Sequence, residues 1–585
     1  MVKQKIDKQT LEGLFKRTAD LLRNKVDYSF ILVIIYYKAL SDYIQQELDE
    51  YGELIKRTEL KPLVQYRWQV VEEMLHDSFN AVETFIQGIH TIENIKDDTG
   101  NQPFKGLLNK YRSFIDDIHE NEGTIIDIIR MYSPYYFTDA DHDIIGDAYE
   151  YFVHNFAIER GKEGEVYTPP EVVRLIVEII QPQPGDSIYD PACGTGGMLI
   201  ETFNYLRNHY GEAKATFSDY YGQEVRSDTY ILANINLYMR GIPFDKMHLA
   251  QGDTLKNPKF VTEDGTLQRF DVVIANPPWN LKGYDWKKLS KSGEIKFVDR
   301  FTYGFPPKNS ADWAWVQHMI ASSSGEKRIG LVIDPGMLTR GNKEFLIRKR
   351  IIEDDLIEAV IMLPSGLFYH SQGLTGIIVI LNKNKPSDRK GKVMFINASD
   401  YYEQHPSIKK LNKLTNIKEI AELIHNWKEK PYVSRIVSIK EICQDVREVM
   451  QKIEEKQEEI AKVDVQIKEI KNKIKNLKKQ IKKRKKSKNV PNETRIKEEI
   501  EELEKKEKEL SAKKEQMQSE IQSIKIENGC SLSVRRYVPI KIDEEDIDAV
   551  AVWKEIQEIN NKIAEHEKFI SKIVDVFFKG EDEHV

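Results

Sequence analysis

The 585-residue sequence lacks any long hydrophobic run. Its longest apolar stretch, FILVIIYY from Phe30 to Tyr37, is far shorter than the roughly 20 residues that a membrane-spanning helix needs. The chain does not open on a basic segment followed by apolar and small residues, so no secretion signal is expected. These absences predict a soluble protein that makes no membrane contact.

Cysteine is scarce as well. Cys193, Cys443 and Cys530 are the three in the chain, and they form neither a CxxC motif nor a paired framework. We therefore expect a cytoplasmic protein in a reducing compartment, with no structural metal. The sequence also contains no GxxxxGK[ST] phosphate loop and no GxGxxG motif, which disfavours ATP-driven work and nicotinamide cofactors.

Acidic residues are only slightly in excess of basic ones: the net charge is -7, although 31% of the residues are charged. A nucleic-acid enzyme usually has a basic surface, so an acidic total suggests that phosphate contacts are local or come from another chain. The length exceeds what one hydrophobic core supports, so three or four structural units are expected.

The spacing of apolar and turn-forming residues changes along the chain. Residues 1–160 are expected to form a helical N-terminal domain, because apolar residues recur at helical spacing without Pro-Gly turns. Residues 161–443 alternate short β-rich runs with stretches of helical length, which predicts an α/β domain with a parallel sheet covered on both faces. The expected strands are 187–190, 270–276 and 328–334, with 356–363 and 374–382 paired at the edge of the sheet.

A heptad pattern begins near residue 445. It places apolar residues at Ile460, Val463, Ile467, Ile470, Ile474, Leu477 and Ile481, and again at Ile496, Ile500, Leu503, Leu510, Met517, Ile521 and Ile524. Pro491 lies in a polar loop between the two arms, so residues 444–527 predict an antiparallel coiled-coil hairpin. A parallel coiled coil between two chains is the alternative. Residues 528–585 are expected to form a C-terminal segment that ends in a helix over 551–577.

A glycine-rich turn, DPACGTGG, follows the first expected strand at residues 190–197. Glycine allows a tight turn and lets a ligand lie against the main chain, so the turn predicts a nucleotide-type site, with a simple packing turn as the alternative. Two acids follow the next strands. Glu224 could accept hydrogen bonds from a ribose, and Asp253 could accept from the exocyclic amine of an adenine.

The segment Asn276-Pro277-Pro278-Trp279 comes directly after the strand at 270–276. The two prolines fix a turn in which the Asn276 amide oxygen and the Pro277 carbonyl can accept from one amino group, while Trp279 stacks on its ring. A conjugated amine is a poor nucleophile, and two acceptors would direct its lone pair at a methyl group without a strong base. Such an amine is unreachable in duplex DNA, so the base would have to flip into the pocket.

These motifs, in this order, resemble those of amino-methyltransferases, and EVYTPP at 165–170 resembles the (Q/E)xxTP element of adenine-N6 enzymes. Nearly the whole chain resembles the modification (M) subunit of a type I restriction-modification system, including LFKRTADLLRN, ADWAWVQHMI, VIMLPSGLF and GIIVILNK. The resemblance implies a doubly wound, Rossmann-like class I methyltransferase domain that methylates adenine N6 in DNA and uses S-adenosyl-L-methionine.

The resemblance also implies roles for individual residues. The target adenine would meet Asn276, Pro277, Pro278 and Trp279. The cofactor would be bound by Glu165, Val166, Tyr167, Thr168, Pro169, Pro170, Asp190, Gly194, Thr195, Gly196, Gly197, Glu224 and Asp253.

The partners implied by the resemblance are double-stranded DNA, a specificity (S) subunit and a restriction (R) subunit. The chain has no room for a target-recognition domain of the usual size, so its sequence specificity would come from the S subunit, on which the terminal helix would dock. The hairpin separates the sheet domain from SLSVRRYVPI, a segment that normally follows that domain closely.

Three questions stay open from the residues alone. Asn-Pro-Pro-aromatic also occurs in enzymes that methylate protein glutamine or guanine amines of ribosomal RNA. A non-catalytic cofactor-binding scaffold is the alternative from another class. The lysine-rich run Lys471–Lys488 is a solvated helix surface or a contact for DNA phosphates, and a third option is that this region contacts the partner subunit through the apolar seam.

Overall fold

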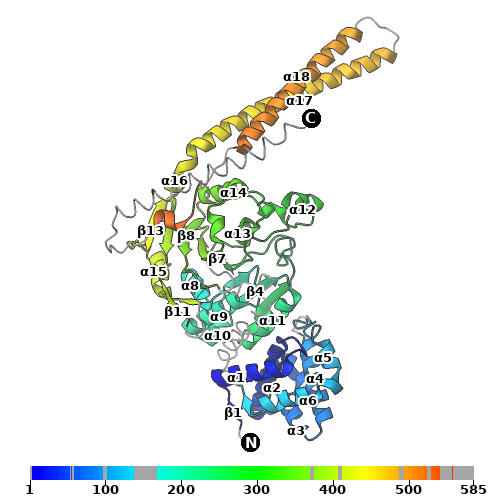
Figure 1. Cartoon of the computed structure of the whole chain (residues 1–585), viewed down its shortest axis with the longest axis vertical. Coiled ribbons are helices and arrows are strands. Elements are labelled where there is room, and N and C mark those ends of the chain that lie inside the picture. Colours follow the sequence, from blue (N-terminus) through cyan, green and yellow to red (C-terminus); the bar gives the residue numbers. More distant parts are fainter. Residues whose placement is uncertain are drawn as a thin grey trace. The chain divides into compact units, whose positions relative to one another are not determined.

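The structure is a computed structural model of the whole chain (Figure 1). It describes residues 3–52, 55, 58–96, 100, 102–137, 168–368, 375–405, 411–486, 493–523, 529–539 and 557. Contacts divide the chain into two compact units, Met1–Val538 and Pro539–Val585. The loop around Pro491 and, apart from Gln557, the helix predicted over 551–577 lie outside the described residues.

The N-terminal part is helical around a core of its own. Residues Phe30 to Leu40 are buried on every side of one long helix, which explains their continuous apolar run. Asp7, Asp77 and Asp117 cap three other helices by accepting a backbone N–H in the first turn. The elements are β1 (Gln4–Lys5), α1 (Lys8–Leu22), α2 (Phe30–Tyr51), η1 (Thr58–Tyr66), α3 (Trp68–Glu73), α4 (Ser78–Glu93), α5 (Arg112–Asp116), α6 (Ile118–Tyr132) and β2 (Tyr135–Tyr136). None of the helices among the described residues is long and apolar enough to cross a membrane.

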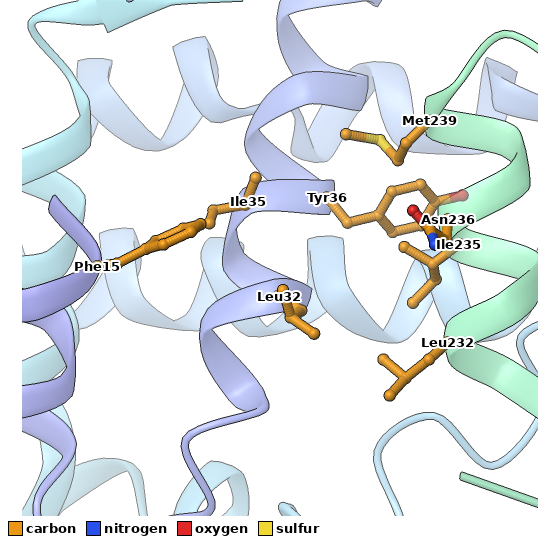
Figure 2. A pocket seen from close by; sticks show the side chains of 8 residues that line it. All are labelled: Phe15, Leu32, Ile35, Tyr36, Leu232, Ile235, Asn236 and Met239. Atoms are coloured by element: carbon orange, nitrogen blue, oxygen red, sulfur yellow. The ribbon is translucent and has the colours of Figure 1, made fainter. Parts of the chain in front are cut away.

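The helical part packs against α11 (Ser227–Met239), a helix of the α/β part. A small apolar pocket marks this contact, lined from one side by α1 and α2 and from the other by α11 (Figure 2). Its lining residues are Phe15, Leu32, Ile35, Tyr36, Leu232, Ile235, Asn236 and Met239. The neighbouring Leu237 faces the glycine-rich turn, so the helical part supports that turn through α11.

A nine-stranded sheet forms the centre of the α/β part, in the order β13-β10-β8-β9-β7-β6-β3-β4-β5. The strands are β3 (Ser187–Asp190), β4 (Asp219–Glu224), β5 (Met247–Gln251), β6 (Val272–Ala275), β7 (Ile329–Ile333), β8 (Ile357–Met362), β9 (Ile377–Leu381), β10 (Lys392–Asn397) and β13 (Ser434–Ser438). A separate two-stranded sheet pairs β11 (Tyr402–Gln404) with β12 (Asn412–Leu414). The strands predicted from the sequence thus lie in one sheet.

Helices cover both faces of the sheet, as the continuous apolar strands predict. Along β6, Val272 and Ile274 face one core, and Val273 and Ala275 face the other. The first core is completed by α8 (Pro170–Ile180), α9 (Gly197–Tyr210) and α15 (Ile417–His425). The second is completed by α13 (Asp312–Ala321), α14 (Asn342–Glu353), α16 (Ile439–Ile442) and α19 (Val534–Tyr537). The remaining short elements are α10 (Glu212–Ala215), α12 (Trp286–Ser292), η5 (Phe244–Lys246), η6 (Val298–Arg300), η7 (Pro335–Leu338) and η8 (Gln444–Val446).

Two expectations about the sheet are wrong. The sheet is mixed, not parallel, because β9 runs antiparallel to both β7 and β8, and β13 runs antiparallel to β10. The connection from β8 to β9 carries no crossover helix among its described residues, and such a short return favours an antiparallel pair. The pair β8 and β9 is also not at the edge, since β10 and β13 extend the sheet beyond β8.

The heptad region forms two long helices, α17 (Arg447–Lys486) and α18 (Glu493–Ser523). Lys456 pairs with Glu520 near one end, and Lys478 pairs with Glu504 near the other, so the helices run antiparallel. Their contact buries Val463, Ile467 and Met517. These are positions that the heptad pattern places between the arms.

The expectation that the cysteines form no pair is wrong. Cys443, just before α17, forms a disulfide with Cys530, just after α18, across a sequence separation of 87 residues. The antiparallel helix pair brings these distant positions together at its base, which the spacing in the sequence does not reveal. Arg348 of α14 is fully buried there and donates to the carbonyl oxygens of Gly529 and Cys530.

Candidate active site

Four neighbouring strands carry predicted site residues at their carboxyl ends. In the order of the sheet, Asn276 follows β6, Asp190 ends β3, Glu224 ends β4 and Asp253 follows β5. These strands are mutually parallel, so all four ends lie at the same edge. This edge is where open α/β sheets bind ligands, and the predicted cofactor turn and the predicted base pocket lie on adjacent strands.

The glycine-rich turn connects β3 to α9. Gly194 and Gly196 both adopt positive φ angles, of 54° and 86°. A Cβ atom on Gly196 would lie 2.1 Å from Cδ1 of Leu237 on α11, so a side chain is excluded there by both conformation and space. The Asn236 side chain donates to the Thr195 carbonyl at 2.9 Å, and Gly197 begins α9. At Gly194, Gly196 and Gly197 the turn therefore presents main chain to the sheet edge, and Thr195 is the one residue among these four that carries a side chain.

The carboxylates of Asp190 and Glu224 flank this turn. Asp190 accepts from the Ala192 N–H at 2.9 Å, and Glu224 accepts from the Gly194 N–H at 3.2 Å and the Arg226 N–H at 2.8 Å. The pKa of Asp190 is raised to about 8, chiefly by burial; the Ala192 N–H acts against this rise, and the nearby Glu224 carboxylate adds to it. A ligand with positive charge beside Asp190 would restore the charged form.

Asp253 is fixed at the third strand end. One carboxylate oxygen accepts from the Lys256 N–H at 3.1 Å, and the other accepts from the Tyr284 hydroxyl at 2.9 Å. Burial raises the pKa of Tyr284, and the adjacent Asp253 adds to the effect, so the phenol stays a donor. The loop after β5 is thereby tied to the chain that follows β6.

Asn276 makes two side-chain hydrogen bonds that fix the orientation of its amide. The indole N–H of Trp279 donates to Oδ1 at 3.0 Å, and Nδ2 donates to the Thr168 hydroxyl at 2.7 Å. An indole nitrogen can only donate, so the group facing Trp279 must be the amide oxygen. The acceptor of Asn276 thus points to the side where Trp279 lies, and Thr168 holds the amide from the other side.

The structure places Phe368 beside Trp279, with ring centroids 5.3 Å apart and an interplanar angle of 64°. The sequence patterns did not single out Phe368. Phe368 could have been identified from its position shortly after β8, near the same sheet edge.

An ion network that the sequence did not predict lies behind the Asn-Pro-Pro-Trp turn. Asn280 adopts a left-handed conformation, with φ of 54°, and its N–H donates to Asp312 at 2.8 Å. Arg340 contacts the Asn280 side-chain oxygen and bonds to Asp312 and Asp334, at 2.9 and 2.6 Å. Its guanidinium also lies 3.4 Å from Glu344. The end of the turn is therefore anchored to α13, α14 and the end of β7.

Of the other predicted residues, Glu165, Val166 and Tyr167 lie outside the described residues. Pro169 is the N-cap of α8, and Pro170 is its first residue. Thr168, assigned to the cofactor by resemblance, lies at Asn276. The described residues contain no cluster of histidine, cysteine and carboxylate side chains that could hold a metal ion.

Residues 140–461 match the family model described as N-6 DNA Methylase. A type I restriction enzyme methylase subunit of Methanocaldococcus jannaschii is 40% identical over 465 residues, which cover 75% of this chain and 76% of the relative. One from Haemophilus influenzae is 32% identical over 61% of this chain and 75% of its own length. Among solved structures, a type I restriction-modification system methyltransferase subunit from Streptococcus thermophilus matches with a TM-score of 0.62 and 25% identity, covering 75% of this chain and 98% of that one.

Proposed function

Because this chain belongs to the N-6 DNA methylase family, among the methylase subunits of type I restriction enzymes, we propose that it methylates adenine N6 in DNA at the Asn276–Trp279 turn. The observation that carries the proposal is the adjacency of β3 and β6. One strand ends at the glycine-rich turn and the other at an asparagine whose amide oxygen is oriented by Thr168 and Trp279.

The site fits S-adenosyl-L-methionine, which supplies an electrophilic methyl group when bound. The glycines at 194, 196 and 197 would let a ligand lie close to the main chain, and a Cβ on Gly196 would disturb the turn by clashing with Leu237 of α11. Three carboxylates on adjacent strand ends match a cofactor that carries a cationic centre, a ribose and an adenine. We assign the cation to Asp190, the ribose hydroxyls to Glu224 and the adenine amine to Asp253. Residues 165–170 complete the proposed cofactor site, with Thr168 shared between cofactor and base pockets.

The residues of the chain activate the target amine by position. When a flipped adenine enters, its amino group takes the place of the Trp279 N–H at Oδ1 of Asn276, and the Pro277 carbonyl accepts the second hydrogen. Both acceptors would draw the nitrogen toward a tetrahedral form and direct its lone pair toward the side of the glycine-rich turn, where the bound cofactor would supply the methyl group. The Trp279 ring, supported by Phe368, then stacks on the base.

The proposal includes the partners and the domain limits. We expect an S subunit to supply the sequence specificity and an R subunit to supply restriction, with the C-terminal segment 528–585 docked on S. The domains in this scheme are 1–160, 161–443, 444–527 and 528–585, with 444–527 as a coiled-coil hairpin inserted between the methyltransferase domain and the C-terminal segment.

Transfer of labelled methyl groups from the cofactor tests this function. The chain is incubated with duplex DNA, protein or ribosomal RNA, with and without its S subunit. Label in the adenine of DNA, increased by the S subunit, supports the proposal. Label confined to protein or RNA would contradict it, and a chain that binds cofactor but labels nothing would support a scaffold.

Thr168 gives a prediction that separates positioning from cofactor binding. Thr168→Val removes the hydroxyl that accepts from Asn276, and we expect kcat to fall roughly tenfold, as for the loss of one buried hydrogen bond. Thr168→Ser should restore most of the rate. The cofactor Kd, measured by titration, should rise in Thr168→Val by a smaller factor than kcat falls, because Thr168 also lines the proposed cofactor site, and it should return toward the wild-type value in Thr168→Ser. A weaker cofactor Kd with an unchanged kcat would place Thr168 in the cofactor site alone.

The buried carboxyl of Asp190 predicts a pH dependence of cofactor binding. Its pKa of about 8 means that the carboxyl is mostly protonated at pH 7, whereas a cationic ligand favours the charged form. The cofactor Kd should therefore fall as the pH rises, by up to about tenfold per unit, and level off above about pH 8. Asp190→Asn should bind more weakly and keep only the slope that comes from the cofactor itself. An identical pH profile in both proteins would contradict the assignment.

A further inference from the structure

The chain between the Asn-Pro-Pro-Trp turn and α13 carries a concentration of lysine. We call residues 282–296 the lysine segment. It contains two acids, Asp285 and Glu294, and five lysines, so its net charge is +3 (five minus two) in a chain of net charge -7. All five lysines are exposed: Lys282, Lys287, Lys288, Lys291 and Lys296. A local positive surface therefore begins three residues after Trp279.

The backbone of the lysine segment is held in place by buried aromatic side chains. Tyr284 and Trp286 stack with ring centroids 4.9 Å apart, and Trp286 packs edge-on against Phe301. Tyr284 donates to Asp253, and the Lys296 N–H donates to the Lys256 carbonyl at 2.8 Å. The segment is thereby fixed to the loop after β5, with its lysines on the outside.

None of these five lysines forms an ion pair with another residue of the described part of the chain. The lysines of the helix pair differ: Lys471, Lys473 and Lys478 of α17 each face a glutamate of α18, at 3.4, 3.5 and 2.7 Å. Among the described residues, three lysines of the helix pair thus form ion pairs, and none of the lysine segment does.

We infer that the lysine segment binds the DNA backbone on either side of the flipped nucleotide. The inference rests on the proposed function, since it takes DNA as the molecule at the turn. A base that leaves the helix brings its own flanking phosphates to the mouth of the pocket, where the lysine segment begins. Lysines act there as point charges that release counterions from DNA, so their contribution is independent of sequence and sensitive to salt.

The test compares two triple variants in the complex with the S subunit. The first is Lys287→Gln, Lys288→Gln and Lys291→Gln on α12. The control removes three exposed lysines of α17 that form no ion pair with a described residue: Lys468→Gln, Lys475→Gln and Lys479→Gln. Both variants lose the same charge. DNA affinity is measured against salt concentration, on duplexes with and without the target sequence, together with the cofactor Kd as a check of folding.

The α12 variant should bind both duplexes about ten- to a hundredfold more weakly, with a salt slope lower by about two to three. Its cofactor Kd should not change, and the control should keep the wild-type slope. An α12 variant with the wild-type slope, or one that loses the S subunit instead of DNA, would overturn the inference. If the wild-type complex binds DNA with this salt dependence but transfers no methyl group to it, the proposed function fails and the lysine contact stands.

Discussion

The Asn276→Ala variant is expected to transfer methyl groups to DNA adenine roughly 10² to 10³ times more slowly than the wild-type chain. The alanine removes the acceptor that faces Trp279, and the amine of the base loses one of the two hydrogen bonds proposed to activate it. Mutations that remove one preorganised group from a transition state have effects of this size. The rate is measured as labelled methyl incorporated into DNA under single-turnover conditions.

Two controls separate this loss from damage to the fold. The cofactor Kd of Asn276→Ala should stay close to that of the wild type, because the glycine-rich turn lies on the neighbouring strand. Asn309→Ala changes an exposed asparagine in the same connection between β6 and α13 and should leave the rate unchanged. If the rate of the Asn276→Ala variant lies within threefold of the wild-type rate, Asn276 does not take part in the reaction.

Replacing Arg340 by methionine is expected to lower both stability and activity. The side chains of Asp312, Asp334 and Glu344 are at most 9% exposed, and the substitution leaves them without their shared cation. Because Arg340 itself is partly exposed, we expect a loss of about 2–4 kcal/mol in the free energy of unfolding. Asn280 also loses its contact, so the turn loosens and kcat should fall at least tenfold. Chemical denaturation and methyl transfer measure the two effects.

The same network predicts how the loss depends on pH. Burial raises the pKa of Glu344 to about 7, and Arg340 acts against this, so the Arg340→Met variant raises the pKa further. A glutamate with a raised pKa binds its proton more tightly in the folded chain, so stability falls as the pH rises from the usual 4.5 through about 7. The deficit of the variant should be larger at pH 8 than at pH 5.5. Arg340→Lys, which keeps the charge but not the planar fork, should be intermediate.

Much of the sheet and of the site follows from local sequence. The strands 187–190, 270–276 and 328–334 are apolar on consecutive positions because they are buried on both faces, and the structure confirms them as β3, β6 and β7. The carboxyl-edge rule then places Asp190, Glu224, Asp253 and Asn276 together without further information. Each motif follows its own strand directly, so a small error in strand limits does not move it.

The parts that could not be predicted depend on contacts between distant segments. The orientation of the Asn276 amide depends on Thr168, 108 residues earlier, and the anchoring of the turn depends on Arg340. The disulfide of Cys443 and Cys530 forms because α17 and α18 run antiparallel, which brings the chain after α18 back to the beginning of α17. In each case the partner of a side chain is set by the packing of segments that lie far apart in the sequence.

In the proposed reaction, the site at the edge formed by β3 and β6 transfers a methyl group to the exocyclic nitrogen of adenine in DNA. Mass analysis of the nucleosides released from DNA treated with the S-subunit complex tests this reaction. We expect N6-methyl-2′-deoxyadenosine with the wild-type chain and only a trace with Asn276→Ala. A methylated cytosine, or an equal yield of methyladenosine from both proteins, would contradict it.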